Sequence, residues 1–311
     1  AERGIHMDIY RPKPPQKPRS RMLVIHGAAE DGKDDARLVR ICHLLARMGF
    51  KIYAPSIREF MDWKMGTTGI DDIAYIYEKY IMPEDKATRG MLSYSVGSAG
   101  LFAAASKEEI AADIDYIISF GGYYDAKNIL LFMTTGYYYD NGVWKKAQEK
   151  PAIKRELLKR NLHLIKPDEQ DIALEIIKYG PRQDLLEALS TETRSILGML
   201  YNEDKDTFFS LYENISPAIK EVFEGGSPKN YLPNIKADCY IAHSVPDFVI
   251  PHTESELLAK DLGDNVKGFY TFTIFRHVQA KFANQNLKNI LFSYIPDAVK
   301  FYIFIFRMML L

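Results

Sequence analysis

The chain has 311 residues, a formal net charge of −1, 47% hydrophobic residues and two cysteines. A chain of this length can bury a large core and carry an inserted second unit, and its near neutrality excludes the strong positive field that binding to a nucleic-acid backbone requires. Small molecules are therefore the expected partners, and Cys42 and Cys239 are expected to be buried free thiols, which leaves the redox compartment open.

The first part of the chain alternates strand-like and helix-like segments. The apolar run over 22–27, which ends in His26-Gly27, predicts a central parallel strand covered on both faces. Apolar residues recur at helical spacing behind it and stop at Gly49. Further predicted strands are 5–10, 51–57, 91–94 and 115–120, and a further predicted helix is 73–80. This alternation is typical of a mostly parallel α/β sheet.

The alternation stops between about Asp125 and Asn234, where the apolar spacing predicts only helices with charged residues between them. It resumes after Pro233, with predicted strands over 238–244 and 268–275 and a helix over 254–261. We therefore predict an α/β core in two parts, 1–124 and 236–311, interrupted by an inserted helical cap over 125–235.

Ser95 lies where an apolar run, 91–94, gives way to the Ala-rich stretch 101–106. The residues two places to either side, Ser93 and Gly97, are small. This pattern is typical of a nucleophile elbow, in which a serine occupies a sharp, strained turn between a strand and a helix. The alternative is a serine that merely caps the N-terminus of that helix.

Two further residues follow Ser95 in the order that a Ser-Asp-His triad needs. Asp247 comes just after the predicted strand 238–244, and His277 follows the last predicted strand. Asp125 is a competing acid because it also follows a strand, and Asp247 could instead simply begin the next helix. His252 is expected to begin that helix rather than to act as the base.

The predicted strand that ends in His26-Gly27 supplies a second oxyanion donor. The backbone N–H of Ala28 could face the same oxygen as the N–H of Val96, which follows the serine. We expect His26 to brace this loop rather than to react.

On these residues the sequence resembles the α/β-hydrolase superfamily over most of 5–124 and 236–300. The segment around Asp247 (SVPDFVIP) is similar to the common acid loop of that superfamily. The segments GKDD, GGYYD and TTG resemble a little-characterised bacterial group related to dienelactone-hydrolase-like enzymes. Ser93 replaces the usual first glycine of the elbow, and Ser244 replaces the glycine that usually precedes the acid loop.

The expected function is that of a serine hydrolase acting on a small acyl substrate, an ester or a thioester, through an acyl-enzyme intermediate. Two alternatives stay open: a peptidase or acyl-aminoacyl hydrolase with the same triad, and an inactive binding module with the same fold. Aromatic residues of the insertion are candidate substrate contacts, although they could equally pack the cap. They are Tyr137, Tyr138, Tyr139 and Trp144.

No metal or cofactor motif is found, so the sequence predicts neither. The apolar segment 301–311 is predicted to be a closing core helix, with a peripheral membrane contact as the alternative, since it is too short for a span. The location stays open between the cytoplasm and, if a leader has been removed, the bacterial cell envelope. Nothing in the sequence predicts the oligomeric state.

Overall fold

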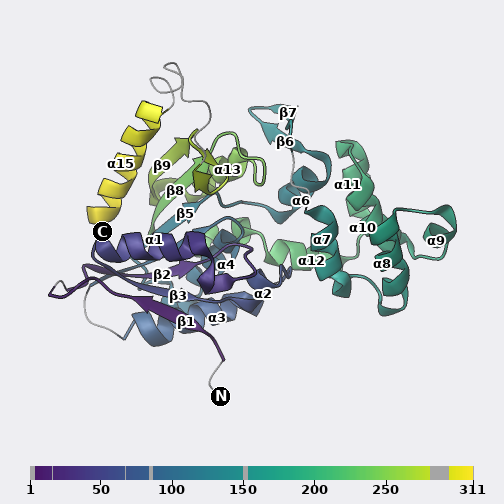
Figure 1. Cartoon of the computed structure of the whole chain (residues 1–311). Helices are drawn as coiled ribbons and strands as arrows, with labels where there is room; N and C mark the ends of the chain where they lie inside the picture. The colour runs from purple at the N-terminus through teal and green to yellow at the C-terminus, as the bar shows by residue number, and fades with distance from the viewer. Residues whose placement is uncertain are drawn as a thin grey trace.

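A computed structural model describes residues 4–15, 17–66, 68–83, 87–149, 153–280 and 294–310 of the protein. Its centre is a sheet of seven strands, with helices on both faces (Figure 1). In spatial order the strands are β1 (Met7–Tyr10), β3 (Phe50–Pro55), β2 (Ser20–Ile25), β4 (Thr88–Tyr94), β5 (Tyr116–Phe120), β8 (Asp238–Ser244) and β9 (Val266–Phe272). Only β1 runs antiparallel to its neighbour; the other pairs are parallel. The predicted α/β architecture is confirmed.

Two helical layers bury the faces of the sheet because the central strands are apolar on both sides, as β2 illustrates with every residue buried. One layer consists of α1 (Ala36–Arg47) and α15 (Ile295–Leu310). The other contains α3 (Thr68–Ile76), α4 (Gly97–Ala105) and α13 (His252–Leu262). Two single-turn helices, α2 (Arg58–Met61) and α5 (Glu108–Ala111), also flank the core.

The segment between β5 and β8 forms a helical unit to one side of the sheet, opposite α15 in Figure 1. Its buried apolar side chains make a core of their own. Its helices are α6 (Ala126–Thr135), α7 (Lys154–Arg160), α8 (Gln170–Tyr179), α9 (Gln183–Glu187), α10 (Thr191–Tyr201), α11 (Lys205–Glu213) and α12 (Pro217–Gly225).

The insertion also contains an antiparallel hairpin that its helical pattern does not predict. The hairpin consists of β6 (Tyr137–Asp140) and β7 (Val143–Lys146). Asn141 and Gly142 both have positive φ, 48° and 84°, at its turn. Asn-Gly between β-branched or aromatic residues is a strong local hairpin signal, so the sequence did contain the information.

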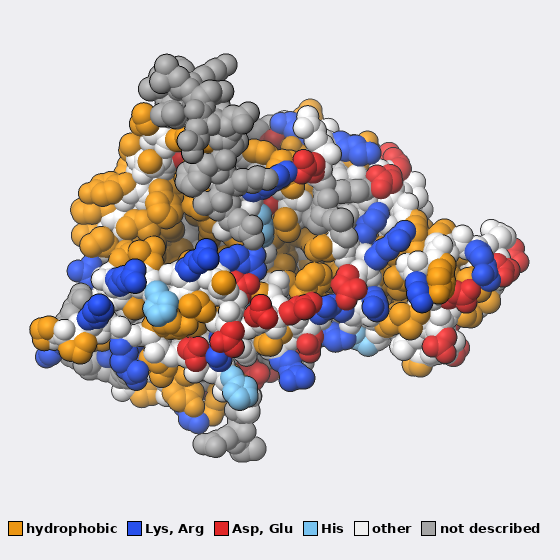
Figure 2. Space-filling view, viewed as in Figure 1, with side chains coloured by type: hydrophobic (Ala, Val, Ile, Leu, Met, Phe, Trp, Pro, Cys, Tyr) orange, Lys and Arg blue, Asp and Glu red, His pale blue; other side chains and the backbone are white. Residues whose placement is uncertain are grey.

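Helix α15 is apolar on most of its surface, and it buries only one face against the core. Phe304 and Met308 are buried in the core cluster that includes Tyr270 and Phe272 of β9. The outer face exposes apolar side chains, which appear as an orange area over the helix in Figure 2. Across the described ranges, no helix combines the length and apolar character that a membrane span requires. A peripheral membrane contact by this helix stays a prediction.

Candidate active site

Ser95 lies at the sharp turn between β4 and α4. Its φ of 56° is in the left-handed region, which is strained for a residue with a side chain. The start of α4 lies so close to the end of β2 and the residue after it that a Cβ on Gly97 would lie 2.4 Å from the carbonyl oxygen of His26. The turn therefore has the geometry of a nucleophile elbow, and it requires a glycine at position 97.

Ser93, which replaces the first glycine of the elbow, has its hydroxyl in a small buried cluster of serine side chains. The Oγ of Ser93 donates to the Oγ of Ser98 at 3.1 Å, and that oxygen lies 2.9 Å from the Oγ of Ser119. All three side chains are buried. The hydroxyl of Ser93 thus has a partner, and this departure from the usual motif leaves the turn intact.

His277 joins Ser95 to Asp247. Its Nε2 lies 2.8 Å from the Oγ of Ser95, and its Nδ1 lies 2.8 Å from Oδ2 of Asp247. It follows the short strand β10 (Phe275–Arg276), which pairs with β11 (Gln279–Ala280). A carboxylate at Nδ1 holds the ring proton there, so the lone pair on Nε2 faces the serine hydroxyl.

Arg276, the residue before His277, contacts two other segments of the chain. Arg276 forms an ion pair with Glu149 of the insertion, and its guanidinium lies 4.7 Å from the ring centre of Phe248. The loop of the histidine is therefore attached both to the insertion and to the loop of Asp247.

Asp247 is buried and accepts hydrogen bonds on both oxygens. Oδ1 accepts from the backbone N–H groups of Val249 and Ile250 at 2.8 and 3.0 Å, and Oδ2 accepts from the Oγ of Ser244 at 2.9 Å. Burial by itself would raise the pKa of this carboxyl, but hydrogen bonds from His243 and His277 outweigh burial and lower that pKa well below its usual range. Asp247 is therefore ionised at neutral pH, and the serine at position 244 adds a donor to it.

His243 braces the acid loop, a role that the sequence reasoning did not identify. Its Nε2 lies 3.0 Å from the carbonyl oxygen of Ile250 and 3.3 Å from Oδ2 of Asp247. Both partners are acceptors, so Nε2 carries a proton, and Nδ1 lies 2.6 Å from the Oγ of Ser255. Its position directly before Ser244 at the end of β8 was the available signal.

One predicted oxyanion donor, the N–H of Ala28, lies on the loop after β2 that a second buried histidine holds, and the other, the N–H of Val96, is at the N-terminus of α4. The Nε2 of His26 accepts from the backbone N–H of Ile57 at 2.9 Å, so its Nδ1 donates to the carbonyl oxygen of Gly27 at 2.6 Å. Burial lowers the pKa of His26, which keeps it neutral. Ala28 and Val96 line the same cavity. Within the described part of the chain, neither of their backbone N–H groups donates a hydrogen bond.

This cavity, of about 150 Å³, lies between the core and the insertion. Core residues such as Ala28 and Ala99 form one wall, and Met133, Leu157 and Phe223 of the insertion form another. The insertion therefore covers the side of the sheet where Ser95 lies.

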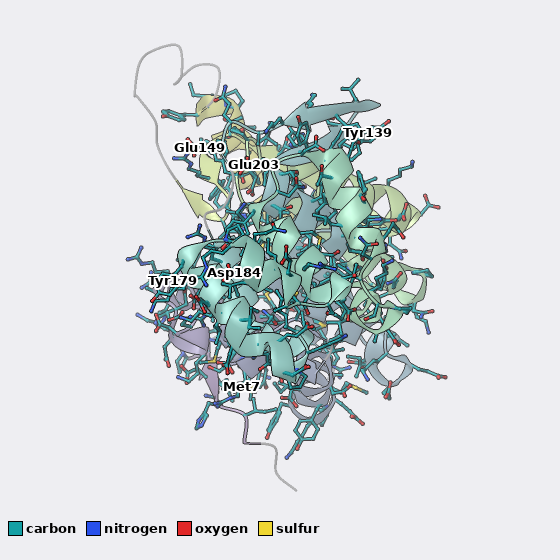
Figure 3. All side chains as sticks on the ribbon, turned by 90° about the vertical axis from the view of Figure 1, so that its right-hand side faces the viewer. Met7, Tyr139, Glu149, Tyr179, Asp184 and Glu203 are labelled. Carbon is teal, nitrogen blue, oxygen red and sulfur yellow. The ribbon has the colours of Figure 1, made fainter. Side chains whose placement is uncertain are left out.

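The aromatic residues predicted as substrate contacts lie elsewhere. Tyr138, Tyr139 and Trp144 line a different cavity, of about 600 Å³, against α13, and Tyr137 lines neither cavity. The hairpin causes this placement, because Trp144 packs edge-on against Tyr139 across its two strands. Figure 3 shows Tyr139 at the top of the insertion, away from Tyr179 and Asp184 of its helical part.

The competing triad residues are engaged in other contacts. Asp125 caps α6 and pairs with the Nζ of Lys229 at 2.8 Å. His252 begins α13, packs against the ring of Tyr138 and lies 3.9 Å from Glu256. The triad geometry therefore involves Asp247 and His277 rather than either competitor.

One set of side chains could converge on a metal ion, although the sequence shows no metal motif. Asp140, His252 and Glu256 each offer a ligand atom within 4.8 Å of the others. The carboxylate of Asp140 is already bound by Lys145 and Asn141, at 2.6 and 2.7 Å. A metal ion there would have to displace Lys145.

None of the protein-family models matches the chain, and no curated protein matches it. Several solved structures do. A protein of Legionella pneumophila that carries a provisional hydrolase name aligns with a TM-score of 0.55 and 10% identity, over 88% of this chain and 77% of its own. An acylaminoacyl peptidase of Pyrococcus horikoshii aligns with a TM-score of 0.50 and 16% identity, over 88% of this chain and 35% of its own.

A puromycin-hydrolysing peptidase of Mycobacterium tuberculosis also aligns with a TM-score of 0.50, at 14% identity, over 89% of this chain and 34% of its own. The chain thus spans about a third of the length of these two peptidases. At such identities the likeness concerns the fold.

Proposed function

Because this chain has the α/β-hydrolase fold, we propose that it is a serine hydrolase that cleaves a carboxylic ester or thioester. The observation that carries the proposal is the bridge that His277 makes, with 2.8 Å contacts to both Ser95 and Asp247. A hydroxyl, an imidazole and a buried carboxylate in this order are the parts that acyl transfer through a serine needs.

In the first half of the reaction, the Oγ of Ser95 attacks the acyl carbon while its proton moves to Nε2 of His277. The ionised Asp247 holds the other ring proton on Nδ1 and stabilises the imidazolium that forms. The negative oxygen of the tetrahedral intermediate accepts from the N–H groups of Ala28 and Val96, each worth about 3 kcal/mol in related sites. His277 then gives its proton to the leaving oxygen or sulfur, which departs and leaves the acyl group on Ser95.

In the second half, water takes the place of the leaving group. His277 removes a proton from this water, the hydroxyl attacks the acyl carbon, and the same two N–H groups hold the new oxyanion. Collapse of the intermediate releases the carboxylic acid, and the proton on His277 returns to Ser95.

The test is labelling with a fluorophosphonate, which reacts with an activated serine. We expect the wild-type protein to label, and Ser95→Ala and His277→Ala not to label. Hydrolysis of p-nitrophenyl esters by the same three proteins should follow the same order. A folded wild-type protein that neither labels nor hydrolyses any ester would refute the proposal and favour an inactive binding module.

Amide cleavage is a second candidate because of one polar group in the cavity wall. Oε2 of Glu59 is buried and has no hydrogen-bond partner within the described ranges, and Glu59 lines the 150 Å³ cavity. A carboxylate oxygen in that position could hold the N-terminal amine of a peptide. Turnover of aminoacyl p-nitroanilides that Glu59→Gln lowers more than it lowers ester turnover would support this candidate.

A further inference from the structure

The 150 Å³ cavity offers a substrate mainly apolar surface. Side chains that line it include Phe60, Ile70, Ile129, Leu157, Val222 and Phe223. Two of its polar side chains have partners in the protein: the hydroxyl of Tyr123 donates to the carbonyl of Gly226 at 2.8 Å, and Lys64 donates to the carbonyl of Arg160. Such a wall binds hydrocarbon by excluding water from it.

A second cavity, of about 70 Å³, is lined mainly by residues of the insertion and shares part of its wall with the first. Residues that line both cavities are Met65, Leu130, Met133, Leu157 and Phe223. The other walls of the second cavity include Ile196, Met199, Leu200 and Phe208 of α10 and α11. The two cavities are thus adjacent apolar chambers; the first is lined by Ala28 and by Val96, the residue after Ser95, and the second lies farther into the insertion.

The polar side chains that line the second chamber also have partners in the protein. Thr134 donates to the carbonyl of Leu130 at 2.8 Å, and the amide of Asn161 donates to the carbonyl of Trp63 at 2.8 Å. Lys154 contacts the carbonyl of Thr134 at 3.5 Å. Since these groups have partners, nothing in this chamber favours a charged end on the substrate.

The position of the catalytic groups indicates which half of an ester enters the chambers. Ala28 and Val96 line the first chamber, whereas His277 does not. The leaving group must face His277, which protonates it, so it lies on the other side of the acyl carbon. The chain that extends from the two N–H donors into the insertion is therefore the acyl chain.

The volumes set the length of that chain. An apolar cavity of about 150 Å³ holds a six-carbon molecule such as benzene. The first chamber has that volume, and the second adds about half as much. Together they accommodate about nine carbons beyond the reacting carbonyl.

We propose that the substrate of this site carries a straight apolar acyl chain of about eight to ten carbons, with its distal end in the chamber between α6 and α10. This inference rests on the proposed esterase or thioesterase function and adds the substrate class. The insertion determines the length of the acyl chain that fits, because the far wall of the second chamber limits how far the chain can extend.

The experiment measures kcat/KM for p-nitrophenyl esters from acetate to palmitate. Each buried methylene is worth about 0.8 kcal/mol, so kcat/KM should rise about fourfold per carbon up to about ten carbons and then fall. Leu200→Trp fills the second chamber and should shift the maximum to about six carbons, lowering the decanoate-to-butyrate ratio at least tenfold. If the tryptophan impairs folding, Leu200→Phe replaces it in the test. The smaller ring should shift the maximum in the same direction, but by fewer carbons.

Tyr179→Trp is the matched control because Tyr179 lies on the outside of α8 and is 72% exposed. It introduces the same ring into the same insertion and should leave the chain-length profile unchanged. A flat profile, a maximum at acetate, or a maximum that Leu200→Trp does not move would overturn the acyl-chain proposal while ester hydrolysis itself stands.

Binding separates this inference from the proposed reaction. Decanoate should bind wild type and Ser95→Ala alike, as measured by calorimetry, and more weakly to Leu200→Trp. If decanoate binds but no ester is hydrolysed, the proposed hydrolase function is refuted, whereas the proposed acyl-binding chambers are supported. Preference for aminoacyl esters that depends on Glu59 would overturn the acyl-chain proposal in favour of an amine-binding site.

Discussion

The sharpest prediction concerns Asp247→Asn, which changes one atom of the triad acid. The asparagine oxygen can still accept from the N–H groups of Val249 and Ile250, as Oδ1 of Asp247 does. Its NH₂ group then takes the place of Oδ2, which now lies 2.8 Å from Nδ1 of His277. The NH₂ group of the asparagine and an N–H at Nδ1 of His277 cannot both donate to each other. Nδ1 therefore becomes the acceptor, and the ring proton moves to Nε2.

This exchange of tautomers removes the general base. With a proton on Nε2, His277 cannot accept the proton of Ser95, and no carboxylate stabilises its positive charge. The corresponding substitution in a serine protease lowers kcat about 10,000-fold, which corresponds to about 5.4 kcal/mol of transition-state stabilisation. We expect a loss of that order here, with little change in KM because the acyl cavity is not altered.

The assay is hydrolysis of p-nitrophenyl octanoate at pH 7.5, with Asp125→Asn as the matched control. Asp125 is the other carboxylate that follows a strand, and its contact with Lys229 lies outside the triad. Asp125→Asn should retain activity within about threefold at a temperature where it is folded. If Asp247→Asn keeps more than a tenth of wild-type activity, or if Asp125→Asn is the variant that loses it, the triad assignment is refuted.

Three further predictions concern Ser244 beside the triad acid, Gly97 at the turn of Ser95, and the buried Glu254 of α13. Ser244→Ala removes a 2.9 Å donor to Asp247 and should lower kcat about tenfold with the fold intact by circular dichroism; an unchanged kcat would contradict the role of that hydroxyl. Gly97→Ala places a methyl group 2.4 Å from the carbonyl oxygen of His26, and should cost at least about 2 kcal/mol in urea unfolding and abolish fluorophosphonate labelling; normal labelling would refute the close approach. Burial raises the pKa of the Glu254 carboxyl to about 7, so the folded state holds that proton more tightly than the unfolded state. Stability from this group is therefore full below about pH 4.5 and is lost as pH rises towards 7 and above, by about 3 kcal/mol; Glu254→Gln should flatten this slope in urea unfolding at pH 5 and 8, and an equal slope would count against it.

Much of the core could be predicted because its information is local in the sequence. The strands of the sheet are short apolar runs, and each helix between them has its own apolar spacing and stop signal, as 22–27 and Gly49 illustrate. The ends of parallel strands lie at one edge of the sheet. The sequence alone therefore predicts that Ser95, Asp247 and His277 lie close together. Their hydrogen-bonded geometry agrees with that prediction, and their catalytic role stays a prediction.

The insertion shows where local patterns were insufficient. The sequence pattern predicts substrate contact for the aromatic residues 137–139 and Trp144, but in the hairpin Tyr138, Tyr139 and Trp144 line another cavity. The Asn141-Gly142 turn gives a local reason for the hairpin, but nothing local gives the side of the molecule on which it packs.

The sequence by itself determined the chain order of Ser95, Asp247 and His277 after predicted strands, the elbow at Ser95 and the existence of a helical insertion, because each strand end, turn and helix is marked by residues a few positions apart. The tertiary structure alone decided that His243 contacts Asp247 in the acid loop, that Ser93 has a partner in Ser98, and that two adjacent apolar chambers lie between the core and the insertion and within the insertion. The chambers arise from contacts between distant segments, whereas the two side-chain contacts join near neighbours whose side chains meet only in the folded turns. Close packing of side chains fixes both kinds of contact when the whole chain is folded.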